Sequence, residues 1–96
     1  MITIQDVINN YKPEKVILFG SRANGMANKG SDWDYLIIKE TKTHRINRRE
    51  EALTEFLDVP ADLLILTPRE IEFLLLSKSE FIQSILDNGT LIYEKK

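Results

Sequence analysis

Residues 20 to 38 read Gly-Ser-Arg-Ala-Asn-Gly-Met-Ala-Asn-Lys-Gly-Ser-Asp-Trp-Asp-Tyr-Leu-Ile-Ile, and this stretch holds the most informative pattern of the chain. It begins with a glycine-serine turn directly after the apolar run 15–19, and it ends in a second apolar run that opens with two aspartates. Both runs are rich in β-branched and aromatic residues, so they predict two strands, at 15–19 and 33–39. The composition of residues 28–31 predicts a loop before the second strand.

The turn at Gly20-Ser21 has the features of a phosphate-binding turn. A glycine after a buried strand lets the backbone approach a ligand closely, and the short helix predicted over 22–26 would present unpaired N–H groups at its N-terminus. Ser21 adds a hydroxyl, and Arg22 adds a positive charge within reach of a phosphate oxygen. The same dipeptide is also common in ordinary turns, so the turn alone does not decide between these interpretations.

Three aspartates at the starts of predicted strands are the candidate catalytic and metal-binding residues. Residues two apart in a strand point the same way, so Asp32 and Asp34 are expected on one face. Asp62 opens the apolar run 63–66, and it joins the other two if that run lies beside 33–39, which the sequence leaves open. Such oxygen ligands suit Mg²⁺ or Mn²⁺, and three acids around two metal ions suit nucleotidyl transfer. The alternative is that the aspartates are solvated residues at turns and strand ends.

Helical spacing predicts two helices in the first sixty residues. Apolar residues at helical spacing follow Thr3 and predict a first helix that ends at Lys12-Pro13. A second helix is predicted over 48–57, with Leu53, Phe56 and Leu57 on its inner face. A basic cluster at its start is interpreted as solvated, with contact to a partner, ATP or RNA left open; it consists of Lys42, His44, Arg45, Arg48 and Arg49.

Capping signals predict the last third of the chain. Capping boxes at 67–70 and 77–80 open two helices. The second helix is expected to bury Phe81, Ile82, Ile85 and Leu86, and Asn88-Gly89 is expected to end it in the left-handed conformation. A short last strand is predicted at 90–93. Since strands and helices alternate, the sequence predicts an α+β fold in which helices cover a mixed β-sheet mainly on one face.

Composition limits the class of protein. The 96 residues are expected to form one domain, over 1–96. A net charge of -2 makes nucleic acid an unlikely partner, and the absence of cysteine excludes disulfides and thiolate metal sites. The N-terminus lacks the pattern of a signal peptide, and the apolar runs are too short to span a bilayer. We therefore expect a cytoplasmic protein with no membrane association.

Taken together, Gly20-Ser21, Gly25 and Ser31-Asp32-Trp33-Asp34 resemble the signature of the DNA polymerase β-type nucleotidyltransferase superfamily. The short length is similar to that of its minimal nucleotidyltransferase (MNT) branch, and the resemblance covers essentially the whole chain. It implies the polymerase β-like nucleotidyltransferase palm fold. It also implies an enzyme that uses ATP as its substrate with two Mg²⁺ ions.

The resemblance assigns expected roles to the residues of the motif. The turn would hold the triphosphate through Gly20 and Ser21, with Arg22 and Ser31 as further binding residues. The paired aspartates, Asp32 and Asp34, would bind both metal ions. Asp62 matches the third carboxylate, which assists in activating the attacking hydroxyl and completes the metal site.

The resemblance also implies a partner. Minimal members commonly pair with a four-helix HEPN protein, in many cases as a toxin–antitoxin module in a hetero-oligomeric complex. There the MNT protein acts as antitoxin and, in several systems, transfers AMP from ATP to a tyrosine of the toxin. Two alternatives stay open: an antitoxin that neutralises by binding alone, and nucleotidyl transfer to a small molecule or RNA.

Overall fold

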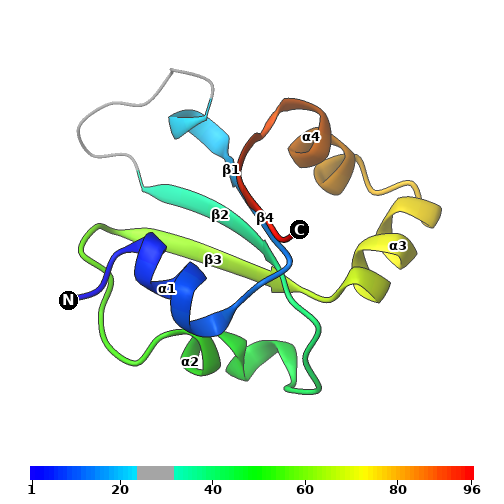
Figure 1. Cartoon of the computed structure of the whole chain (residues 1–96). Helices are drawn as coiled ribbons and strands as arrows, with labels where there is room; N and C mark the ends of the chain where they lie inside the picture. The colour runs from blue at the N-terminus through cyan, green and yellow to red at the C-terminus, as the bar shows by residue number, and fades with distance from the viewer. Residues whose placement is uncertain (24–31) are drawn as a thin grey trace.

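The computed structural model describes residues 1–23 and 32–96. These residues form a four-stranded sheet with helices packed against it, as Figure 1 shows. In chain order the elements are α1 (Ile4–Tyr11), β1 (Lys15–Phe19), the 3₁₀ turn η1 (Gly20–Arg22), β2 (Trp33–Ile38), the 3₁₀ turn η2 (Arg45–Asn47), α2 (Arg48–Ala52), β3 (Ala61–Leu66), α3 (Pro68–Leu76), α4 (Glu80–Asn88) and β4 (Thr90–Glu94). In this part of the chain, no helix has the length and apolar character needed to cross a membrane.

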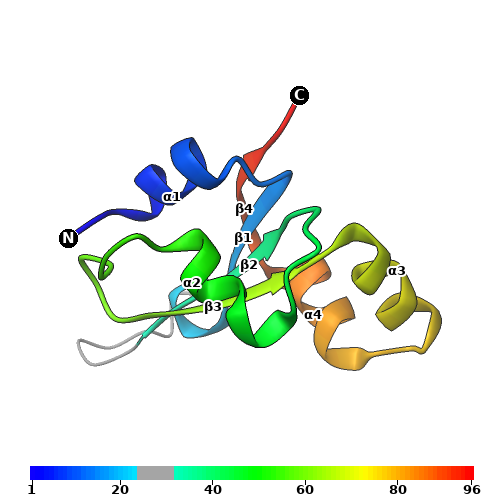
Figure 2. The ribbon, with the colours of Figure 1, turned by 90° about the horizontal axis from the view of Figure 1, so that it is seen from below.

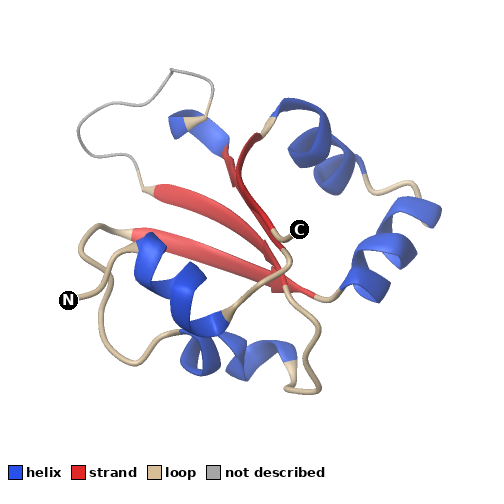
Figure 3. Ribbon diagram, viewed as in Figure 1, coloured by secondary structure: helices blue, strands red, loops and turns tan. Residues whose placement is uncertain are grey.

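The sheet is mixed, with the strand order β3-β2-β1-β4. β1 pairs antiparallel with β2 and with β4, whereas β2 and β3 run parallel (Figure 3). The predictions at 15–19, 33–39 and 90–93 are confirmed to within one residue at each end. Because β2 and β3 are parallel neighbours, their N-terminal ends lie side by side, which brings together the residues that open the two strands.

Helices cover both faces of the sheet, so the prediction that they lie mainly on one face is wrong. Alternate residues of a strand point to opposite faces. In β2, Tyr35 and Ile37 pack in one core with α1 and α2, while Leu36 and Ile38 pack in a second core with α3 and α4. Figure 2 shows α1 and α2 on one side of the sheet and α3 and α4 on the other. A continuous apolar run such as 35–38 is typical of a strand buried on both faces. The α+β class and the mixed sheet are confirmed.

Local capping signals correctly located two helix starts. Thr3 and Thr67 each form a complete capping box, with Asp6 and Glu70 respectively, in which side chain and backbone bond reciprocally. α1 ends where predicted, because Lys12 adopts the left-handed conformation with φ of 55° before a proline. These signals involve only residues three or four apart, so the sequence alone suffices to read them.

Three other helix boundaries differ from the prediction. α2 ends at Ala52, since the chain beyond it extends and pairs with the N-terminus through the bridge between Ile2 and Leu57. Phe56 is consequently 86% exposed rather than on an inner face. Ser77 caps the end of α3, and Ser79 is the N-cap of α4. Gly89 ends α4 with φ of −72°, not in the left-handed conformation.

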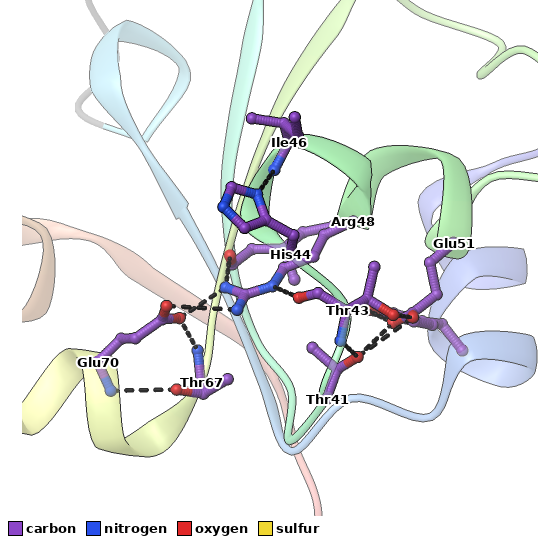
Figure 4. Close-up of polar contacts among 10 residues, drawn as sticks. Thr41, Thr43, His44, Ile46, Arg48, Glu51, Thr67 and Glu70 are labelled. Atoms are coloured by element: carbon purple, nitrogen blue, oxygen red, sulfur yellow. Dashed lines mark hydrogen bonds and ion pairs between the residues drawn. The ribbon is translucent and has the colours of Figure 1, made fainter.

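Arg48 is buried, although the sequence placed it in a solvated cluster. Its guanidinium donates hydrogen bonds to the backbone oxygens of Thr43 (2.8 Å) and Ile65 (3.0 Å). It also forms an ion pair with Glu70, with Nη1 2.6 Å from Oε1 (Figure 4). Arg48 therefore connects α2 to the C-terminal end of β3 and to the start of α3, at the edge of the sheet.

We expect Arg48→Ala to lower the free energy of unfolding by about 3 kcal/mol, because it leaves Glu70 and two backbone oxygens without their donor. Urea unfolding measures this loss. The matched control is Arg49→Ala. Arg49 is exposed and donates one hydrogen bond, of 3.2 Å, to the backbone oxygen of Ala61, so we expect a loss of unfolding free energy of less than about 1 kcal/mol. Equal losses in the two variants would contradict the structural role of Arg48.

The same ion pair predicts a dependence on pH. The hydrogen bond from Arg48 is the main cause that lowers the pKa of Glu70 below its ordinary value. A lowered pKa in the folded state stabilises the protein above the ordinary pKa, and this stabilisation is lost as the pH falls through the lowered value. The difference in stability between wild type and Arg48→Ala should therefore shrink at acidic pH.

Candidate active site

Asp34 and Asp62 lie opposite each other on neighbouring strands. They are register partners across the parallel pair β2 and β3. Each stands two residues before an apolar residue of the core under α3 and α4, namely Leu36 and Leu64, so both carboxylates point to that face of the sheet. The sequence left open whether these strands are neighbours, and the structure shows that they are.

The three predicted aspartates influence one another electrostatically. Burial, followed by repulsion from Asp62 and then from Asp32, raises the pKa of the Asp34 carboxyl above its ordinary value. Asp34 is half-buried, whereas Asp32 and Asp62 are exposed. Like charges held this close destabilise the fold until a cation or a proton offsets them. The negative charge of these residues therefore favours the approach of a cation.

The carboxylates of the cluster suit a divalent cation that takes its remaining ligands from a substrate. Within residues 1–23 and 32–96, no three Asp, Glu, His or Cys side chains are gathered closely enough to hold a metal ion by themselves. Carboxylate oxygens nevertheless match Mg²⁺ and Mn²⁺, which are commonly bound by one or two carboxylates together with substrate phosphates and water. Asp34 with Asp62 and Asp32 would form the protein's side of such a site.

Gly20 lies directly against the Asp34 carboxylate. β1 and β2 pair Phe19 with Asp34, which places the following turn beside the acid. Gly20 adopts φ of +76°, and a Cβ built on it would lie 2.5 Å from Oδ2 of Asp34. Only glycine tolerates both the left-handed backbone and this close approach. The predicted phosphate turn and the predicted metal ligands are thus adjacent in space.

The other predicted binding residues are placed differently. Ser21 follows Gly20 in the 3₁₀ turn η1. The guanidinium of Arg22 lies 4.7 Å from the ring centroid of Trp33, which packs against the core under α1 and α2. Ser31 and most of the helix predicted over 22–26 fall outside the described residues.

A cleft of about 520 Å³ opens between the Gly20 turn and α4. Phe19 and Gly20 line one side, and Phe81, Ser84 and Asn88 line the other. The sequence interpretation placed Phe81 in the core and gave the other two residues of α4 no role. Their spacing on α4, at 81, 84 and 88, is the signal that one face of this helix borders a site.

The family model described as "Polymerase beta, Nucleotidyltransferase" matches residues 3–96. The chain belongs to this family. Its structure is also similar to the crystal structure of a candidate nucleotidyltransferase from Sulfolobus solfataricus, with a TM-score of 0.63 and 20% sequence identity over 96% of this chain and 74% of that chain. At this identity the likeness concerns the fold, and it confirms the nucleotidyltransferase fold expected from the sequence. No curated protein matches the sequence.

The general activity follows from the family. The chain is a nucleotidyltransferase-type domain, a class that typically uses a nucleoside triphosphate and a divalent metal ion. Asp34, Asp62 and Gly20 are the candidates for the metal-binding and phosphate-binding groups of such a reaction.

Proposed function

We propose that this protein is a Mg²⁺-dependent adenylyltransferase that acts as an antitoxin and transfers AMP from ATP to a tyrosine of a HEPN-family toxin. The observation that carries the catalytic part is the pairing of Asp34 with Asp62 beside the Gly20 turn. The partner and the acceptor rest on the resemblance of the motif and of the length to the minimal nucleotidyltransferase branch.

The reaction is a displacement at the α-phosphorus of ATP. The phenolic oxygen of the toxin forms a bond to this phosphorus, while the bond between the phosphorus and the oxygen bridging to the β-phosphate breaks and pyrophosphate leaves. Asp62, exposed at the start of β3, accepts the phenolic proton. Mg²⁺, when bound, offsets the charge of the triphosphate and of the leaving pyrophosphate.

The remaining residues bind and orient. Asp32 and Asp34 would hold the cation, with Asp62 completing the ligand set. Gly20 lets the Asp34 carboxylate lie directly against the turn that would hold a phosphate group, because a Cβ there would lie 2.5 Å from Oδ2. Ser21 offers its hydroxyl at the same turn.

The test is the intact mass of a co-expressed HEPN-type partner after incubation with this protein, ATP and Mg²⁺. We expect the partner to gain one or more AMP units, and we expect no gain with the variant that carries both Asp32→Ala and Asp34→Ala. A stable complex without any gain in mass would overturn the catalytic role in favour of neutralisation by binding. Labelled product formed without any protein partner would indicate a small-molecule or RNA acceptor instead.

A further inference from the structure

One face of α4 carries an unusual combination of side chains. Phe81, Ser84, Ile85 and Asn88 follow the helical spacing i, i+3, i+4 and i+7, so they form one stripe along the helix. All four line the 520 Å³ cleft. Phe81 is 57% exposed, so part of its ring is accessible to a ligand in the cleft. The stripe therefore offers an aromatic ring, an aliphatic side chain and two polar groups to the same space.

The cleft begins where the phosphate turn ends. Gly20 belongs both to the wall of the cleft and to the contact with Asp34. A triphosphate held at this turn would thus have the cleft directly beside it, on the same face of the sheet as the acids. A volume of this size is typical of pockets for small ligands and cofactors.

The Phe81 ring is held in a defined position. It packs edge to face against Phe19, with ring centroids 5.9 Å apart and an interplanar angle of 82°. Phe19 in turn packs against the core under α3 and α4, so the pair is anchored to the sheet. A fixed aromatic ring that leaves one side open to solvent is a suitable platform for stacking a nucleobase.

Asn88 supplies a polar group at the other end of the stripe. Its side-chain nitrogen lies 3.5 Å from the Ser84 oxygen, which is a long contact that leaves the amide able to serve a ligand. A single amide offers one acceptor and one donor side by side, which matches the N6 and N7 edge of adenine. The same edge of guanine presents two acceptors and does not match.

We infer that the cleft between the Gly20 turn and α4 binds the nucleobase of the triphosphate, with Phe81 stacking on the base and Asn88 selecting adenine. This inference rests on the proposed nucleotidyl transfer and adds the specificity for the base. Ser84 and Ile85 complete the wall between these two residues.

The test is isothermal titration of the full chain with ATP, GTP and inorganic tripolyphosphate, each with Mg²⁺. We expect Phe81→Ala to weaken ATP binding by about tenfold and to leave tripolyphosphate binding within about twofold, because stacking involves only the base. The matched control is Phe73→Ala, since Phe73 is 65% exposed on α3 and lies outside the cleft; both ligands should bind as in wild type.

A second variant tests the selection of adenine. Asn88→Ala should reduce the preference for ATP over GTP by about tenfold, as expected for the loss of a two-bond contact to a base edge. If Phe81→Ala leaves ATP binding unchanged, or weakens ATP and tripolyphosphate equally, the nucleobase site is refuted while nucleotidyl transfer stands. If wild type binds neither ATP nor tripolyphosphate, the inference and the proposed function both fail.

Discussion

Asp34→Asn is expected to abolish nucleotidyl transfer while raising the melting temperature of the metal-free domain. Asparagine keeps the shape of the side chain but removes the negative charge that a cation requires. Losing several kcal/mol of metal-dependent stabilisation of the transition state lowers the rate by at least about 1,000-fold. The rise in melting temperature follows because repulsion between Asp34 and both Asp62 and Asp32 disappears. An aspartate with a purely structural role would not give a variant that loses activity and gains stability.

The stability effect has a defined dependence on pH. The pKa of Asp34 is raised in the folded state, so its contribution to stability is favourable below the ordinary pKa and is lost as the pH rises through the raised value. Asp34→Asn removes this loss. The gain over wild type should therefore be complete at neutral pH, where we expect a few degrees, and should vanish in acid below the ordinary pKa.

Thermal unfolding with and without Mg²⁺ and ATP measures both effects. Ligand at a hundredfold excess over its Kd stabilises the native state by about 2.7 kcal/mol, so wild type should melt several degrees higher with Mg²⁺ and ATP, and Asp34→Asn should not. The control for removal of a charge is Glu72→Gln on the exposed face of α3, for which neither quantity should change appreciably. An Asp34→Asn variant with full activity would rule out the metal-binding role.

Much of the fold could be predicted because its signals are local. The run 15–19 is a strand within its predicted bounds, and the capping boxes at Thr3 and Thr67 lie within four residues of chain. Alternation within β2 also correctly placed Asp34 on the same face as Leu36. These features depend on neighbours in the sequence, and no tertiary contact overrides them.

The errors involve partners that are distant in the sequence. α2 stops at Ala52 because Leu57 pairs with Ile2, and no pattern within 48–57 encodes that contact. Arg48 is buried because Glu70, 22 residues further on, accepts its hydrogen bonds. The division of helices between two faces is likewise set by which core each helix covers.

The candidate site shows the same distinction. The sequence showed the three aspartates and the Gly20 turn, but only the parallel pairing of β2 with β3 places Asp62 opposite Asp34. The stripe on α4 was missed because Phe81 was interpreted as core, and its exposure depends on how α4 meets the sheet. The sequence thus predicts the candidate reacting groups, whereas the residues that line the cleft beside them depend on tertiary packing.

Gly20→Ala is expected to reduce nucleotidyl transfer by about 100-fold and to lower the free energy of unfolding by about 1–2 kcal/mol. The stability cost arises from φ of +76°, which disfavours any residue with a Cβ. The new methyl group would also lie 2.5 Å from Oδ2 of Asp34, so that carboxylate must move away. A displacement of about 1 Å of a catalytic group commonly costs two orders of magnitude in rate. Steady-state kinetics and urea unfolding of the purified variant measure the two effects.

Combining Gly20→Ala with Asp34→Ala separates the two causes. Without the carboxylate the steric conflict is gone, and only the backbone strain remains. Gly20→Ala should therefore cost less stability in the Asp34→Ala background than in wild type, which is the coupling expected for two groups in direct contact. If the cost were equal in both backgrounds, the turn would not press on Asp34. The loss of activity would then reflect the altered backbone at Gly20, and the space beside the acid would not be what the glycine preserves.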